Sequence, residues 1–259
     1  MERWSSSLAT TALATAVLSA LSAGPLAAET VDLQLVLAAD VSISVDNEEF
    51  RLQREGYARA ITDPSVLAAI RRGPHHAIAL SFVEWSGASQ QRVVIDWTVI
   101  RDEEAAMSFS AALRTAPRSF AGVTAIGAAI DFAMAQFARS GVESDRRVID
   151  VSGDGDNNSG RPVEYARDDA VNANITVNGL AIVNEHPAPG FIGHVQPPGG
   201  IGEYYRTRVI GGAGSFALVI DSFSKIAETV THKLAAEIAS TGTIRPVAMP
   251  LERRMTPHG

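Results

Sequence analysis

The fold of this chain is decided by one short stretch, Leu33-Gln34-Leu35-Val36-Leu37-Ala38-Ala39-Asp40-Val41-Ser42-Ile43-Ser44. It begins as a continuous apolar run, which is typical of a central strand covered on both faces. It then breaks into one carboxylate, Asp40, and two hydroxyls at alternate positions, Ser42 and Ser44. A lone buried charge is costly unless it is paired or binds a metal. Because Mg²⁺ takes carboxylate, hydroxyl and water oxygens in octahedral geometry, the stretch predicts a strand that ends in a divalent-cation site.

The rest of the chain alternates between strand-like and helix-like segments, which predicts a parallel, doubly wound sheet. The short link 86–89 favours an antiparallel hairpin at one edge. The fold class that we expect is therefore α/β, with a mostly parallel sheet, one antiparallel edge strand and helices on both faces. Strands are expected at residues 31–39, 77–85, 91–97, 146–151, 175–183 and 215–220, and helices at 46–61, 102–114, 126–137, 162–173 and 223–239.

The first 28 residues have the pattern of a secretory signal peptide. A basic residue, Arg3, precedes an apolar segment at 8–21, and small residues lead to a polar Glu29. The apolar segment is shorter than the roughly 20 residues that a membrane span needs. We expect cleavage near Ala28, a periplasmic or secreted protein, and no integral membrane span afterwards. An uncleaved anchor or a disordered tail is the alternative.

Composition narrows the class of protein. A hydrophobic content of 46% and a charged content of 20% are those of an ordinary soluble domain. A net charge of −7 argues against a nucleic-acid partner, because phosphates require a basic surface. The chain has no cysteine, which excludes disulfides, thiolate zinc sites and cysteine nucleophiles.

The remaining residues predict one domain at 29–240 and a mobile C-terminal tail at 241–259. Within the domain, residues 185–214 are rich in proline and glycine, and their centre, 201–209, has helical potential. So long a connection is often functional. Because it follows a parallel strand, we expect this insertion at the same edge as the metal site, where it would shape the specificity for a partner.

Two later segments also place oxygen-bearing residues after strands or before helices. Thr124 lies in a glycine-flanked loop, and Asp154 lies in a glycine-flanked turn after a buried strand. In a doubly wound sheet, ligands collect outside the carboxyl ends of the strands. The absence of histidine and thiolate from these segments disfavours zinc and favours Mg²⁺ or Mn²⁺. The candidate metal ligands are Asp40, Ser42, Ser44, Thr124 and Asp154.

In motif, order and spacing, these three segments resemble the metal-ion-dependent adhesion site (MIDAS) of the von Willebrand factor A-like superfamily. The order of strands and helices resembles that fold from residue 31 to about residue 239, and the pieces around Asp40 and Asp154 are similar to an uncharacterised secreted bacterial subfamily. The resemblance implies direct metal ligation by the three hydroxyls, with the two carboxylates ligating directly or through water. It also implies an open sixth position that takes an acidic side chain of a partner protein. Val41 departs from the glycine that many relatives carry.

Other interpretations remain open from the sequence. Asp40 alone could cap the helix that starts near Asp46, with both serines bonding backbone groups. Asp156, Asn157 and Asn158 resemble a calcium loop, but their spacing does not fit an EF-hand, so we interpret them as turn formers.

The function that we expect is a non-enzymatic, exported module that binds an acidic protein partner through the metal. One alternative is a metal-dependent hydrolase or phosphotransferase at the same acidic edge, but no Gly-x-Ser-x-Gly, His-Glu-x-x-His or phosphate-loop motif is present. The other is an exported structural domain that binds no metal. The sequence does not name the partner.

Overall fold

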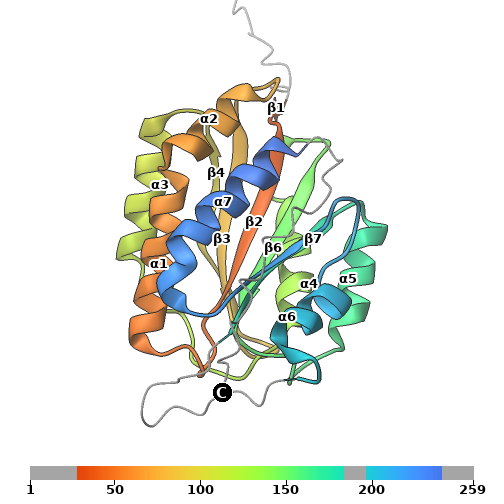
Figure 1. Ribbon diagram of the computed structural model, residues 1–259. Helices are drawn as coiled ribbons and strands as arrows, with labels where there is room; N and C mark the ends of the chain where they lie inside the picture. Colours follow the sequence, from red (N-terminus) through yellow and green to blue (C-terminus); the bar gives the residue numbers. More distant parts are fainter. Residues whose placement is uncertain (1–27, 184–196, 241–259) are drawn as a thin grey trace, which may run out of the picture.

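The structure is a computed structural model that describes residues 28–183 and 197–240 (Figure 1). The expected signal peptide, apart from its last residue, the first part of the expected insertion and the expected C-terminal tail lie outside the described residues.

A six-stranded sheet forms the centre of the molecule, in the order β4-β3-β2-β6-β7-β8. Every neighbouring pair is parallel except β3 and β4, which are antiparallel at one edge. The expected fold class, with its single antiparallel edge strand, is confirmed. The strands are β2 (Leu33–Asp40), β3 (Ile78–Trp85), β4 (Gln91–Ile100), β6 (Arg147–Gly153), β7 (Thr176–Ile182) and β8 (Ala217–Ile220).

Helices cover both faces of this sheet (Figure 1). One face carries α1 (Asn47–Ile61), α2 (Pro64–Arg72), α3 (Glu103–Thr115) and α7 (Ile226–Ala239), the last preceded by a short 3₁₀ turn, Phe223–Lys225. The other face carries α4 (Ile126–Phe137), α5 (Val163–Asn172), α6 (Gly200–Tyr204) and a π-helical turn, Tyr205–Val209. Every residue of β2 is buried, because this strand lies between two other strands and two layers of helices.

The start of α1 fixes the chain that leaves β2. Asp46 accepts hydrogen bonds from the backbone N–H groups of Glu48 and Glu49, each at 2.8 Å, and the Glu49 carboxylate accepts one from the Asp46 N–H at 2.8 Å. This reciprocal capping box satisfies donors that the first turn of a helix leaves open. The loop 40–46, called the metal loop below because it carries three of the candidate metal ligands, therefore has a fixed end at Asp46. The sequence also predicted a helix that starts near this residue.

Two features were missed by the sequence analysis. Helix α2 starts at Pro64 and is capped by Asp63, whose carboxylate accepts a hydrogen bond from the Ser65 N–H at 2.8 Å. It is nine residues long, and the sequence analysis overlooked its two signals, the Asp-Pro pair at its start and the helical spacing of Val66, Leu67 and Ile70. A separate two-stranded sheet joins β1 (Glu29–Thr30) to β5 (Val142–Glu143), and two-residue strands carry no periodicity to detect.

A buried ionic cluster fastens α7 to the sheet. The Lys233 ammonium lies 2.7 Å from the Asp150 carboxylate of β6 and also contacts Glu237 one turn later. The Glu237 carboxylate accepts a further hydrogen bond from the Asn178 side chain at 2.7 Å. All four side chains are buried. Burial, aided by the charge of Asp150, raises the pKa of Glu237 to about 7, although Lys233 opposes this shift.

The raised pKa of Glu237 predicts a pH-dependent stability. Between its ordinary pKa of 4.5 and about 7, the native state binds more protons than the unfolded chain. The free energy of unfolding must therefore fall as the pH rises through this window. Glu237→Gln removes the buried charge, so we expect it to be more stable than the wild type at pH 8 by about 1–3 kcal/mol and to have a flatter pH profile.

Urea unfolding across this range measures both the stability and its dependence on pH. Glu228→Gln, on the exposed face of α7, is the control, and equal slopes in all three proteins would contradict the prediction.

Candidate metal centre

Four of the five predicted ligands form one hydrogen-bonded group at the carboxyl end of β2. The Ser42 N–H donates to the Asp40 carboxylate at 2.7 Å, which closes the loop directly after the strand. The hydroxyls of Ser42 and Ser44 lie 3.1 Å apart, and the Ser44 hydroxyl donates to the Asp154 carboxylate at 2.8 Å. Residues more than a hundred positions apart in the chain thus share one cluster of oxygen atoms.

The fifth predicted ligand, Thr124, lies on a neighbouring loop that is bonded to both other segments. The Ile43 N–H donates to the carbonyl of Gly122 at 2.7 Å. The Thr124 N–H donates to the Asn158 side-chain oxygen at 3.0 Å, and the Asn158 N–H donates back to the Thr124 carbonyl at 2.9 Å. Asn158, interpreted from sequence as a turn former, therefore ties the threonine loop to the segment of Asp154.

The ligand set has the chemistry of a hard-cation site. It offers two carboxylates and three hydroxyls, and oxygen ligands of this kind suit Mg²⁺ or Mn²⁺. A cation bound among them would replace the hydrogen bonds within the group by metal–oxygen bonds. Within residues 28–183 and 197–240, no group of three or more histidine, aspartate or glutamate side chains forms an alternative metal site.

The side chains of all five candidate ligands are buried. None of the five side chains is more than 3% exposed, yet two residues on the same loops, Ile43 and Val123, are 56% and 51% exposed.

An arginine that the sequence analysis missed holds the metal loop in place. The Arg118 guanidinium lies 2.8–2.9 Å from three carbonyl oxygens, those of Val41, Ser42 and Val45. Burial lowers the pKa of Arg118, while the carboxylates around it, Asp40 included, act in the opposite direction. Nothing in the local sequence signals this role, because Arg118 lies more than seventy positions from the loop.

A buried tyrosine, Tyr205, also lies close to the site. A Cβ placed on Gly153 would lie 2.8 Å from the Tyr205 hydroxyl and 2.9 Å from the Asp40 carboxylate, so glycine is needed where β6 ends. Burial and the charges of Asp40 and Asp154 raise the pKa of Tyr205 well above its usual value, which keeps the phenol neutral. Tyr205 belongs to the described part of the insertion, and this part lies against the metal loops.

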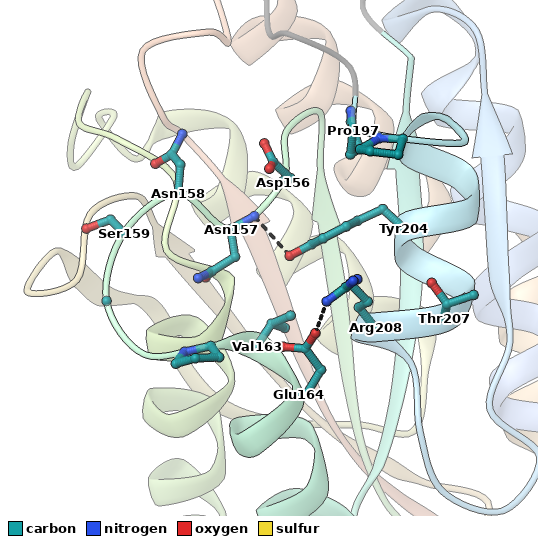
Figure 2. Close-up of a pocket in the computed structure, with 13 residues that line it drawn as sticks. Asp156, Asn157, Asn158, Ser159, Val163, Glu164, Pro197, Tyr204, Thr207 and Arg208 are labelled. Carbon is teal, nitrogen blue, oxygen red and sulfur yellow. Dashed lines mark hydrogen bonds and ion pairs between the residues drawn. The ribbon is translucent and has the colours of Figure 1, made fainter.

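A cavity of about 640 Å³ lies beside the candidate site (Figure 2). The segment that follows Asp154 forms one wall, and α6 with its π-helical turn forms the other. The Tyr204 hydroxyl accepts a hydrogen bond from the Asn157 N–H at 3.1 Å, and an Arg208–Glu164 ion pair joins the two walls (Figure 2). The cavity therefore has both polar and apolar walls, and one wall continues the segment that carries Asp154.

A family model described as "Protein of unknown function (DUF1194)" matches residues 30–242. The chain belongs to this family. No curated protein is similar enough to match.

Solved structures show that this DUF1194 chain has the von Willebrand factor A-like fold. A structure of proximal thread matrix protein 1 from the mussel byssus, with a zinc-occupied MIDAS motif, is 16% identical with a TM-score of 0.58 over 82% of this chain and 49% of that one. A von Willebrand factor type A protein from Catenulispora acidiphila is 15% identical, with a TM-score of 0.56 over 81% of this chain and 43% of that one. The pilus adhesin SpaC from Lactobacillus rhamnosus GG is 11% identical, with a TM-score of 0.58 over 81% and 31%. The DUF1194 chain spans about half or less of each of these proteins.

The contacts of Arg118 predict that the metal loop depends on this guanidinium even without a metal. Arg118→Met removes the hydrogen bonds to three carbonyls, so we expect it to lower the free energy of unfolding in EDTA by about 2 kcal/mol. Arg118→Lys keeps the charge and can still donate to the loop carbonyls, but it cannot also replace the bond from the Arg118 Nε to the Phe120 carbonyl at 2.9 Å, so it should recover only part of this loss. Urea unfolding is the measurement. Arg101→Met, which breaks an exposed ion pair with Glu29, is the control and should change stability little. Full recovery by lysine would mean that the second bond of the guanidinium, from Nε to the Phe120 carbonyl, does not contribute to stability.

Proposed function

We propose that this DUF1194 protein is an exported, non-enzymatic module that binds an acidic protein partner through a divalent cation. The observation that carries the proposal is the convergence of oxygen atoms from three separate segments at the carboxyl edge of one parallel sheet. The residues that would hold Mg²⁺ or Mn²⁺ are Asp40, Ser42, Ser44, Thr124 and Asp154.

The choice of metal is supported by the donor atoms. Zinc prefers nitrogen and sulfur ligands, whereas every donor here is oxygen. The mussel protein with a zinc-occupied MIDAS motif has the same fold, so a divalent cation is compatible with this architecture.

The proposed partner follows from charge and access. Five protein ligands with only two carboxylates leave an octahedral dication with one position for an external ligand, and a carboxylate is a strong ligand for a hard cation. The adhesin among the structural neighbours is consistent with protein binding.

A catalytic role receives less support. Of the histidines in the described part of the chain, His75 and His76 precede β3 at the opposite edge of the sheet, and His232 lies on α7. No described histidine is therefore placed on the metal loops as a general base.

Export is supported by the pattern of residues 1–28. Among the helices that the structure describes, none has the length and apolar character to cross a bilayer. We place the protein in the periplasm or outside the cell, with one domain at 29–240 and a tail at 241–259.

The insertion at 185–214 is proposed to shape partner specificity. In its described part, Ile201 of α6 and Tyr205 and Val209 of the π-helical turn are buried in the core, and the same segment forms a wall of the cavity. Deleting the whole insertion would therefore remove core packing, so its role is better tested by single substitutions in the cavity wall.

The metal site predicts a cation-dependent stability. A ligand that binds only the native state raises stability by about 2.7 kcal/mol at a hundred times its dissociation constant. We expect Mg²⁺ or Mn²⁺ to raise the unfolding temperature of the mature protein above its value in EDTA. Asp40→Asn combined with Asp154→Asn should abolish this rise, because both substitutions keep the shape and remove the charge.

The matched control is Asp145→Asn, an exposed aspartate before β6 at the opposite edge of the sheet. It should keep the full response to metal. A rise that persists in the double variant would place the cation elsewhere. No rise in the wild type, together with no cation-dependent binding to carboxylate peptides, would overturn the proposed function.

A further inference from the structure

One buried tyrosine carries a hydroxyl that the rest of the described chain does not satisfy. Tyr205 is the first residue of the π-helical turn after α6, and its side chain is fully buried. Within residues 28–183 and 197–240, its hydroxyl has no hydrogen-bond partner. A buried hydroxyl without a partner destabilises the native state, so its presence requires an explanation.

Two glycines on neighbouring strands make room for this side chain. Gly153 ends β6, and Gly179 lies on β7, which pairs with it. A Cβ on Gly179 would lie 2.7 Å from the Tyr205 ring, and a Cβ on Gly153 would lie 2.8 Å from the Tyr205 hydroxyl. Neither glycine has a positive φ, so the backbone conformation does not require glycine there. Both positions are therefore kept small by the space that Tyr205 occupies.

The Tyr205 hydroxyl and the Asp40 carboxylate lie next to the same residue, Gly153. The Cβ position of Gly153 is 2.8 Å from the hydroxyl and 2.9 Å from Oδ2 of Asp40. The two oxygen atoms are therefore no farther apart than these two distances together, and no direct hydrogen bond joins them. A single water molecule can bridge two polar groups at such a separation.

The phenol is in the protonation state of a hydrogen-bond donor. Burial raises the pKa of Tyr205 well above its usual value, and the charges of Asp40 and Asp154 act in the same direction. The hydroxyl therefore keeps its proton beside the two carboxylates and can donate it in a hydrogen bond.

We propose that Tyr205 is a positioning residue of the metal centre, whose hydroxyl orients the Asp40 carboxylate toward the cation through one bridging water. This inference rests on the proposed function and deepens it, because it makes a residue of the insertion part of the metal site. Groups that hydrogen-bond the ligands of a metal fix the orientation of those ligands, and their loss commonly weakens metal binding by about 10–100-fold.

The contribution of the hydroxyl should depend on the cation. A buried water typically makes about three contacts with polar groups. Tyr205 and Asp40 offer two, and the third becomes available only when the metal site is loaded. The hydroxyl is therefore expected to strengthen metal binding while adding little to the stability of the metal-free protein.

The test is Tyr205→Phe, which keeps the buried ring and removes only the hydroxyl. The unfolding temperature of the mature protein is measured in EDTA and across a Mg²⁺ titration. In EDTA, we expect the variant to be at least as stable as the wild type, because a buried hydroxyl without a partner has been removed. In the titration, the variant should need about tenfold more Mg²⁺ for the same rise in unfolding temperature.

The matched control is Tyr57→Phe. It removes the hydroxyl of another fully buried tyrosine, which lies on α1 and packs against the other face of the sheet. This variant should respond to the same Mg²⁺ concentrations as the wild type.

Four results would overturn the inference. An unchanged Mg²⁺ response in Tyr205→Phe would separate Tyr205 from the metal centre and leave the proposed function standing. The same loss of stability in EDTA and in Mg²⁺ would show that the hydroxyl only supports the fold. Equal weakening of the response in Tyr57→Phe would assign the effect to buried hydroxyls in general. No response to Mg²⁺ in the wild type would reject the cation site itself, and with it both the inference and the proposed function.

Discussion

The arrangement of this protein depends on the parallel pairing of β2 with β6. Ala39 pairs with Ser152, so both strands leave the sheet at the same level, and the two carboxylates that follow, Asp40 and Asp154, emerge at one edge. A shift of this register would separate the two carboxylates by several ångströms for each residue. Because both faces of β2 are buried against different sets of side chains, a one-residue slip would exchange the faces, and the packing opposes it. The core thus sets the geometry of the candidate metal centre.

Burying charge within such a core requires partners, and the structure supplies them in separate clusters. Glu84 of β3 contacts Arg54 of α1 and accepts a hydrogen bond from the Ser119 N–H at 2.8 Å, which links a strand, a helix and the segment leading to the threonine loop. Lys233 similarly joins α7 to β6 through Asp150. Pairs of this kind add little net stability relative to apolar residues, but removing one member is costly. They therefore constrain which helix packs where.

The metal edge itself combines surfaces of different polarity. The candidate ligands are buried, whereas Ile43 and Val123 on the same loops are exposed. Asp156, two residues after Asp154, lines a cavity together with Tyr204 (Figure 2). A cation alone attracts any carboxylate. Specificity must come from the surfaces around it, and these are supplied by loops whose backbone positions are fixed by hydrogen bonds.

The sequence by itself determined the local elements and the chemical nature of the candidate site. Continuous apolar runs, alternating with helical patterns, gave the doubly wound sheet, and a short link gave its antiparallel edge strand. Oxygen-bearing residues after these strands predicted the site, because the carboxyl ends of parallel strands meet at one edge. Two-residue strands escaped detection because they carry too few residues for a periodic signal, whereas helix α2 has an apolar pattern of helical spacing that the sequence analysis overlooked.

Only the tertiary structure decided what surrounds those oxygens. Arg118 and Tyr205 approach the site from positions far away in the chain, and no spacing rule connects them to Asp40. The exposure of Ile43 and Val123 depends on how two loops bond to each other. Local patterns reflect the periodicity of helices and strands, so they can be recognised in the sequence. Contacts between distant segments follow from how the whole core packs, and they appear only once the chain is folded.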